Sequence, residues 1–259
     1  MFSDFFTVSP RAYPRGPDEI ILTPNFGPVH LAWVVAVLIV WVTVPLLLRR
    51  RERARNVTLY ALAGVLAANE IIRAVLFYRA GVDYRAWLPV EFCSFMIYLT
   101  ILAVFVRKPL LLNVCYALGT TVAIFGVFTP VEYDHPAFSF IYFNGMFSHT
   151  TLVLIPLIFI AAGEFRPDIR KLPVIVGIMA GFSLVVMAPL NHFLDANWFF
   201  LCEAPADTPF ALFEGWVGSP GYLGLTLVLG IVLWTLFYLP FAIGGLTGKR
   251  VGGDAEGNR

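Results

Sequence analysis

Charge is scarce in this chain. Asp, Glu, Lys and Arg together make up 14% of its 259 residues, whereas hydrophobic residues make up 59% and the mean hydropathy is +0.78. A soluble domain carries about 25% charged residues, so the deficit excludes a soluble enzyme or binding domain. Most of the chain must face lipid or other helices. The net charge of only +1 gives no indication of a nucleic-acid-binding surface.

Cysteine and lysine are also scarce. The three cysteines, Cys93, Cys115 and Cys202, lack the paired spacing that predicts a disulfide framework or a zinc site. The few lysines all lie between or after the long apolar runs, which excludes a retinal Schiff base within a span. Residues 1–28 lack a basic region followed by an apolar core, so no cleaved signal peptide is expected.

One group of possible metal ligands lies in the stretch FTPVEYDHPAF. Glu132, Asp134 and His135 carry suitable side chains, but no second histidine or cysteine stands at ligand spacing. We therefore expect a solvated turn in this stretch, with no metal site and no cofactor.

Long apolar runs fill most of the chain. A transmembrane helix needs about 20 mainly apolar residues. The stretches that qualify are 29–48, 57–78, 87–106, 110–128, 139–162, 172–193 and 221–246. The predicted fold is an all-α polytopic membrane bundle of about seven transmembrane helices, with one membrane domain at 29–246. We expect an extracytoplasmic segment at 1–28 and a cytoplasmic tail at 247–259.

The arginines and lysines set the expected orientation. Alternate connections, at 49–55, 107–108, 166–171 and from 249 onward, hold 13 of the 18 basic residues. Basic residues near the ends of spans favour the cytoplasmic side. The N-terminus is therefore predicted to lie outside and the C-terminus inside a multi-pass cell-membrane protein.

The second predicted span carries charged side chains within an apolar run. Asn69, Glu70 and Arg73 follow a series of small residues that suits close helix packing. Each charge within a span costs about 2.5–3.5 kcal/mol on insertion scales. Because Glu70 and Arg73 stand at i and i+3, they are neighbours on one helix face. We expect an inward-facing pair that either joins helices or binds a polar lipid headgroup.

The third predicted span, WLPVEFCSFMIYLTILAVFV, places a carboxylate and a thiol near one end. Pro89 suits the first turn of a helix, where its missing N–H does no harm. Glu91 is then predicted in the same turn, where the helix dipole favours a negative charge. Cys93 lies about 200° further round a regular helix, so Glu91 and Cys93 do not share a face.

Two later spans also carry polar groups. His149 lies in the fifth predicted span, one turn after Gly145, and an ionisable residue within a span is a functional candidate by default. The sixth span ends near Asn191. The aromatic-rich connection that follows, which includes Asn197, is expected to dip into the membrane interface and cover the outer mouth of the bundle.

The predicted topology converts these positions into depths. At about 1.5 Å of rise per residue, Cys93 and Arg73 lie about 9 Å, Glu70 about 13 Å and His149 about 15 Å from the outer ends of their spans. The polar groups thus share the outer half of the membrane, whereas the cytoplasmic half of each span is almost purely apolar. The sequence predicts one intramembrane polar site near the outer leaflet.

Three blocks of sequence carry a family resemblance. They are LPVEFC at 88–93, TPVEYDHPAFSFIYFNGMFSHTTLVLIPL at 129–157, and Asn191 with NWFFLCEAP at 197–205. Over about residues 60–245 the chain resembles the YwaF-type bacterial membrane protein family. Members often have histidine in place of Glu91 and Asn-Tyr in place of Asn197-Trp198. The family is similar to a eukaryotic multispan cysteine acyltransferase that remodels ether phospholipids, and more remotely to androgen-induced lipid hydrolases with an intramembrane threonine and histidine.

The resemblance implies a lipid acyltransferase or hydrolase in the bacterial inner membrane. By this resemblance Cys93 matches the acyl-accepting cysteine and His149 matches the histidine base. This chemistry is coherent, because a thiol becomes a useful nucleophile when a base or a positive environment favours its thiolate.

Other polar groups would complete that chemistry. Asn69, Asn191 or Asn197 is expected to stabilise an oxyanion, and Arg73, next to Glu70, is expected to hold a phosphate. The expected partners are membrane lipids rather than nucleic acid. Two alternatives stay open, a transporter or channel with the charged groups along a substrate path, and a non-catalytic lipid-binding protein whose polar groups only fix helix packing.

Overall fold

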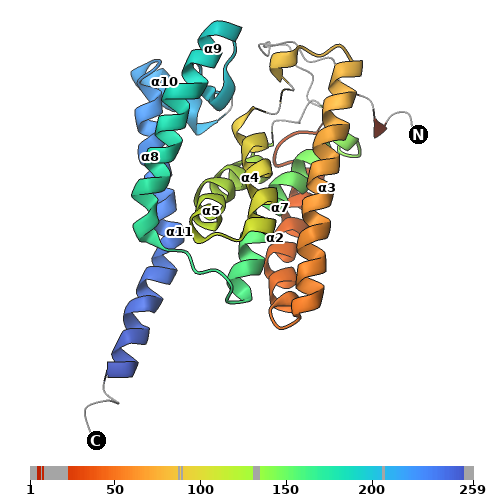
Figure 1. Ribbon diagram of the computed structural model, residues 1–259. Coiled ribbons are helices and arrows are strands. Elements are labelled where there is room, and N and C mark those ends of the chain that lie inside the picture. Colours follow the sequence, from red (N-terminus) through yellow and green to blue (C-terminus); the bar gives the residue numbers. More distant parts are fainter. Residues whose placement is uncertain are drawn as a thin grey trace, which may run out of the picture. The chain divides into compact units, whose positions relative to one another are not determined.

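The computed structural model describes residues 5–6, 8, 23–86, 88, 90–130, 135–205 and 208–253. Within these residues the chain is helical and has no strand (Figure 1), which confirms the predicted all-α membrane fold. The elements are α2 (Pro28–Leu48), α3 (Glu52–Arg79), η1 (Tyr84–Ala86), α4 (Phe92–Val106), α5 (Pro109–Val114), η2 (Cys115–Gly119), α6 (Thr120–Phe128), α7 (Phe140–Ala161), η3 (Ile169–Lys171), α8 (Leu172–Phe182), η4 (Ser183–Met187), α9 (Ala188–Leu194), η5 (Trp198–Phe200), α10 (Pro209–Val217) and α11 (Tyr222–Gly253). Of these, η2 and η4 are π-helical turns inside longer helices.

Six helices among the described residues are long and apolar enough to cross a membrane. The predicted span at 87–106 is wrong in its starting point, because α4 covers only Phe92–Val106, which is 15 residues. At about 1.5 Å per residue α4 is about 22 Å long, shorter than the hydrocarbon core of about 30 Å. The orientation of the termini and the domain boundaries at 28 and 246 stay predictions.

The helices form two compact units, Met1–Glu164 and Phe165–Arg259. In the first unit α7 is the central helix and contacts α2, α3, α4 and α6. The buried share of its apolar window is 72%, against 17% for α2 and 28% for α3. Polar groups on α7 therefore lie inside protein, whereas α2 and α3 leave most of their surface for lipid.

The span before α7 is continuous but contains the π-helical turn η2. A π-helical turn leaves one carbonyl without its usual helical partner. Thr121 Oγ1 donates to the Ala117 carbonyl at 2.8 Å and so satisfies a carbonyl of this turn. Gly119, also in η2, lies beside α4, because a methyl group built on it would stand 3.3 Å from Met96 Cε.

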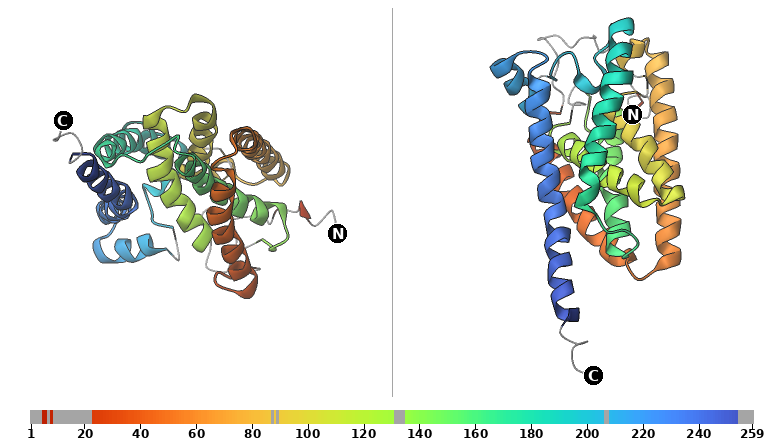
Figure 2. Two further views of the ribbon diagram at one scale, coloured as in Figure 1. Left: turned by 90° about the horizontal axis from the view of Figure 1, so that it is seen from below. Right: turned by 60° about the vertical axis from the view of Figure 1, so that its left-hand side comes forward.

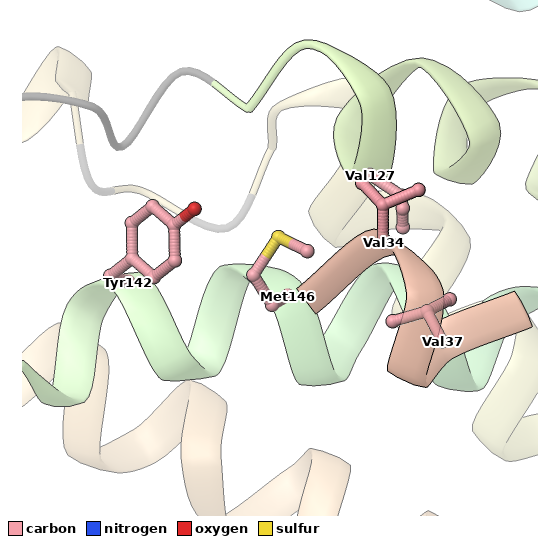
Figure 3. Close-up of a cluster of buried hydrophobic side chains, with 5 residues drawn as sticks. All are labelled: Val34, Val37, Val127, Tyr142 and Met146. Carbon is pink, nitrogen blue, oxygen red and sulfur yellow. The ribbon is translucent and has the colours of Figure 1, made fainter. Parts of the chain in front are cut away.

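A buried apolar cluster joins three helices at the end of the first unit where α2 begins. It consists of Val34 and Val37 on α2, Val127 on α6, and Tyr142 and Met146 on α7 (Figure 3). In the figure Met146 lies between Tyr142 and the two α2 valines, and Val34 meets Val127. This cluster fixes α2 against the α6–α7 pair, although most other residues of α2 are exposed or half-buried.

His30 anchors the same end of α2 by hydrogen bonds. The side chain is fully buried. Its Nε2 donates to the Val127 carbonyl at 2.8 Å, and its Nδ1 accepts from the Phe26 backbone N–H at 2.8 Å. Because a carbonyl only accepts, the neutral ring carries its proton on Nε2. Both ring nitrogens are satisfied, so His30 is a structural histidine.

Replacing His30 by phenylalanine should destabilise the first unit by about 2 kcal/mol. The change keeps an aromatic ring but leaves the buried Val127 carbonyl without its donor, and an unsatisfied buried polar group costs about 1–3 kcal/mol. Unfolding in mixed micelles would measure the loss. His192→Phe is the matched control, because His192 is exposed on α9 and should change stability by less than about 0.5 kcal/mol.

Charged side chains tie the opposite ends of α3, α4 and α7 together. Arg55 is buried and donates to the Glu164 carboxylate, which follows α7. Arg107, at the end of α4, approaches the other Glu164 oxygen at 3.4 Å and donates to Asn56 Oδ1 at 2.8 Å. Two guanidinium groups thus share the Glu164 carboxylate. Arg55 also donates to the carbonyls of Leu48 and Arg49, which holds the turn between α2 and α3 in place.

In the second unit, α8, η4 and α9 form one span and α11 forms another, which is continuous along its length (Figure 2). The π-helical turn η4 ends two residues before Pro189, which has no N–H to donate to the helical carbonyl four residues earlier and whose ring clashes with it. Arg166 Nη2 donates to the Phe241 carbonyl at 3.0 Å, and Tyr222 donates its hydroxyl to the Phe200 carbonyl. The Arg166 bond connects the start of the first of these spans to α11, and the Tyr222 bond connects α11 to the loop between the two spans.

Candidate functional site

The start of α4 differs from the predicted one. Glu91 has extended backbone angles and occupies the N-cap position, so it lies before the first turn rather than within it. Its side chain makes no capping hydrogen bond. Cys93 is therefore the second residue of the helix, and Pro89, predicted in the first turn, lies outside the described residues. The positive end of the α4 dipole acts on the thiol more directly than on the carboxylate.

Cys93 lies on the buried face of α4. Ile97, Thr100 and Val104 follow it at i+4, i+7 and i+11, and all three are buried. Side chains at these spacings share one face of a helix. Cys93 itself is half-buried, because it stands in the first turn, where the helix has just begun.

The pairing of α4 with the following span gives the depth of Cys93. Met96 lies beside Gly119 and Thr100 beside Cys115, so the two segments run antiparallel with a constant register. Extending this register by three residues places Cys93 beside Val122, six residues before the end of α6 at Phe128. At about 1.5 Å per residue, Cys93 lies about 9 Å below that end.

The neighbouring helix α3 gives the same depth. Arg73 bonds to Ser94, which follows Cys93, and α3 continues for six more residues to Arg79, a further rise of about 9 Å. The predicted depth of Cys93 in the membrane stays a prediction. The structure shows that α4 starts about 9 Å short of the ends of its neighbours α3 and α6.

Glu70 and Arg73 form the expected pair on one face of α3. Arg73 Nη2 lies 2.9 Å from Glu70 Oε2, and Arg73 Nε lies 3.3 Å from Glu70 Oε1. The side chain of Glu70 is 5% exposed and that of Arg73 is 13% exposed. The same Nη2 donates to Ser94 Oγ at 3.2 Å. The pair therefore joins α3 to the first turn of α4, directly beside Cys93.

Two further polar groups face this pair. Tyr98, one turn after Ser94, lies close enough to the Glu70 carboxylate for the two groups to interact electrostatically. The Glu91 carboxylate lies close enough to interact with the charge of Arg73. The charges of this cluster therefore add to a net −1, with Glu70 and Glu91 against the single guanidinium of Arg73.

His149 stands inside the unit on α7, with 7% of its surface exposed. Its Nδ1 lies 2.8 Å from the Gly145 carbonyl. Because that carbonyl only accepts, Nδ1 carries the proton of the neutral ring and Nε2 carries the lone pair. Nε2 is buried and has no hydrogen-bond partner among the described residues. In contrast to His30, this ring presents an unused base.

Gly126 of α6 makes room for the His149 ring. A methyl group built on Gly126 would stand 2.4 Å from both Cδ2 and Nε2 of the ring, and 2.6 Å from Cε1. Real carbon atoms do not approach so closely. The Nε2–Cδ2 edge therefore lies directly on the backbone of α6, and only glycine permits this position.

The structure does not join Cys93 and His149 by a hydrogen bond. Nδ1 of the ring is bonded to Gly145, and Nε2 is without a partner among the described residues. Four residues of α6 separate the level of Cys93, beside Val122, from Gly126, which corresponds to about 6 Å along the helix. The Cys93–His149 dyad stays a prediction. Both residues lie in the first unit, beside the second half of the span that ends with α6.

Two of the three asparagines that were predicted to stabilise an oxyanion hydrogen-bond to the backbone of a loop instead. Asn191 Nδ2 donates to the Trp198 carbonyl at 2.8 Å, and Asn191 Oδ1 accepts from the Trp198 N–H at 2.9 Å. Asn197 similarly bonds to the backbone of Cys202 and Glu203. Both asparagines shape the loop after α9 in the second unit. Their oxyanion role stays a prediction, as does that of Asn69, which is buried on α3.

The solvated turn that was expected around the possible metal ligands before α7 is wrong at His135. This residue is fully buried, and its carbonyl accepts from Thr23 Oγ1 at 2.9 Å. Glu132 and Asp134 lie outside the described residues. Among the residues that the structure describes, no group of three histidine, cysteine or acidic side chains is placed to hold a metal ion.

Comparison with known proteins identifies the family of the chain. A model described as the TMEM164 family matches residues 25–238, a range that includes every candidate residue above. No curated protein matches the chain, and neither does any solved structure. The match is to a multispan membrane family, as expected. The finer assignment to the YwaF-type family stays a prediction.

Proposed function

This chain belongs to the TMEM164 family of multispan membrane proteins, and on that premise we propose that it transfers or hydrolyses lipid acyl groups within the membrane. Cys93 is the acyl acceptor and His149 is the base. The substrate enters from the outer leaflet of a bacterial inner membrane, in the orientation that the basic residues predict.

The observation that carries this proposal is the state of His149. A buried polar atom without a partner costs about 1–3 kcal/mol, so a bare Nε2 inside a packed unit calls for an explanation. The Gly145 carbonyl fixes the tautomer that leaves the Nε2 lone pair free. That tautomer is the one that a general base requires.

The surroundings of Cys93 favour a thiolate. The thiol stands at the second position of α4, where unpaired backbone N–H groups and the helix dipole stabilise negative charge. The guanidinium of Arg73 lies next to it through Ser94. Glu70 and Glu91 together outweigh this positive charge, so the N-terminus of α4 is the group that favours the thiolate.

In the first step His149 Nε2 takes the proton of Cys93. The thiolate attacks the carbonyl carbon of a lipid ester, a thioester forms, and the lysolipid oxygen leaves with the proton from His149. In the second step a lipid hydroxyl or water attacks the thioester and restores the thiol. Where the two side chains are not in direct contact, a water molecule relays the proton between them.

Labelling of Cys93 tests this proposal. A lipid-tailed chloroacetamide should alkylate Cys93 of the purified protein, and His149→Gln should slow this reaction about 100-fold, the lower end of general-base effects. Cys202 is an internal comparison, because burial and the carboxylates of Glu203 and Asp195 raise the pKa of its thiol and should keep its labelling slow.

His192→Gln is the matched control, because it removes an exposed histidine from α9 and should leave the labelling of Cys93 unchanged. Equal labelling of Cys93 in the wild type and in His149→Gln would contradict a Cys–His mechanism.

A further inference from the structure

A second lipid-facing feature lies at the opposite end of the first unit, at the start of α3. An open hollow of about 510 Å³ follows one side of this helix and is lined by Glu52, Arg53, Asn56, Val57 and Tyr60. A second hollow of about 560 Å³ shares Glu52, Arg53 and Val57 with it and extends to Arg51. Together they form a continuous surface depression, which we call the α3 hollow.

The rim of the α3 hollow is strongly basic. Residues 49–55 contain five arginines and one glutamate. Arg55 is turned inward and bonds to Glu164 and to the carbonyls of Leu48 and Arg49. The other four arginines are exposed and take part in no ion pair within the described chain. Glu52 is the one acidic group in the hollow, so the rim keeps an excess of positive charge.

Asn56 supplies a directed donor within the hollow. Its Oδ1 accepts from Arg107 Nη2 at 2.8 Å. That bond fixes the orientation of the amide and leaves Nδ2 to donate. The Arg53 guanidinium and Asn56 Nδ2 therefore offer hydrogen bonds to one anion at the same wall of the hollow.

The lower part of the hollow is apolar and aromatic. Tyr60 stacks on Phe105 of α4, with ring centroids 5.5 Å apart. Tyr60, Phe105 and Val57 are 48%, 62% and 62% exposed. Aromatic side chains with a polar tip are typical of the membrane interface, and here they continue from the basic rim along the membrane-spanning direction of α3.

We propose that the α3 hollow binds one anionic phospholipid of the leaflet on this side, which the distribution of arginine and lysine predicts to be cytoplasmic. The phosphate lies between Arg53 and Asn56 Nδ2, and an acyl chain lies along Val57, Tyr60 and Phe105. The arrangement of a basic rim above an apolar aromatic wall matches a lipid better than a free anion. This site is distinct from the proposed acyl-transfer site and does not depend on it.

Native mass spectrometry of the delipidated full-length protein tests the site, with dioleoyl phosphatidylglycerol as the probe. One lipid should bind at saturation, and Arg53→Gln should weaken this binding about fivefold, the effect of one arginine near an anionic lipid. Arg50→Gln is the matched control, because it removes the same charge from the same turn but does not line the hollow. It should weaken binding less than twofold.

Several results would overturn the site. An equal loss in Arg50→Gln and Arg53→Gln would mean a diffuse charge effect of the whole turn. Equal binding of dioleoyl phosphatidylcholine would remove the anionic headgroup from the proposal, and displacement by glycerol 3-phosphate would show that the acyl chain is not recognised. A dimer that Tyr60→Ala dissociates, with no bound lipid, would assign the hollow to a second copy of the chain.

Discussion

Replacing Arg73 by methionine should destabilise the first unit by about 4 kcal/mol, the largest effect that we expect from any single substitution. The change leaves the Glu70 carboxylate, which is 5% exposed, without its counter-ion. Breaking a buried ion pair from one side costs about 3–5 kcal/mol, because the remaining charge stays buried and uncompensated. Ser94 Oγ loses its donor in the same variant.

Two further variants separate the ion pair from general damage. Glu70→Leu with Arg73→Met should recover most of the loss, because a buried pair replaced by apolar groups is often neutral. Arg85→Met is the control, since its pair with Asp83, at 2.8 Å, is partly exposed and should contribute less than about 1 kcal/mol. Unfolding in mixed micelles measures all three. A loss of less than 1 kcal/mol in Arg73→Met would contradict the buried pair.

The second large effect is expected at Gly126. A methyl group at this position would stand 2.4 Å from two atoms of the His149 ring, so either the ring or α6 must move. Overpacking of this kind costs about 1–3 kcal/mol and occasionally more, and we expect about 3 kcal/mol because the ring is buried and bonded to Gly145. Acylation at Cys93 should fall with it, because Nε2 is displaced.

Gly64→Ala is the matched control for Gly126→Ala. Gly64 also lies inside a spanning helix, but a methyl group built there meets nothing within 4 Å. Alanine has the higher helix propensity, so this variant should be unchanged or more stable by up to about 1 kcal/mol. His149→Ala in the Gly126→Ala background should restore stability without restoring acylation. If Gly126→Ala behaves like Gly64→Ala, the close contact is refuted.

Hydropathy predicted most of the fold because the membrane leaves few options. A span must be apolar and long, and its backbone must bond within itself, so the ends of α2 and α7 lie within one residue of prediction. The start of α4 was missed for a related reason. The stretch before Phe92 is apolar enough to continue a span, but Glu91 has extended angles and the helix begins after it. Local backbone geometry, not hydropathy, decides that boundary.

The candidate site was predicted only as far as local spacing reaches. The Glu70–Arg73 pair follows from i, i+3 spacing and the cost of a buried charge. The bond from Arg73 to Ser94 and the contact of Gly126 with His149 join residues on different helices. Only the tertiary register determines such pairs. In the sequence, Ser94 is marked only by its position beside Cys93, and Gly126 only as a glycine within an apolar span.

The acylated state of Cys93 tests the central claim most directly. The purified protein would be incubated in nanodiscs with a phospholipid that carries an isotope-labelled acyl chain, and the peptide containing Cys93 would be analysed by mass spectrometry. We predict a labelled acyl group on Cys93 that neutral hydroxylamine removes, and none in Cys93→Ser or His149→Ala. Lipid turnover that continues in Cys93→Ser, or a wild-type protein with no acyl group on Cys93, would contradict the account.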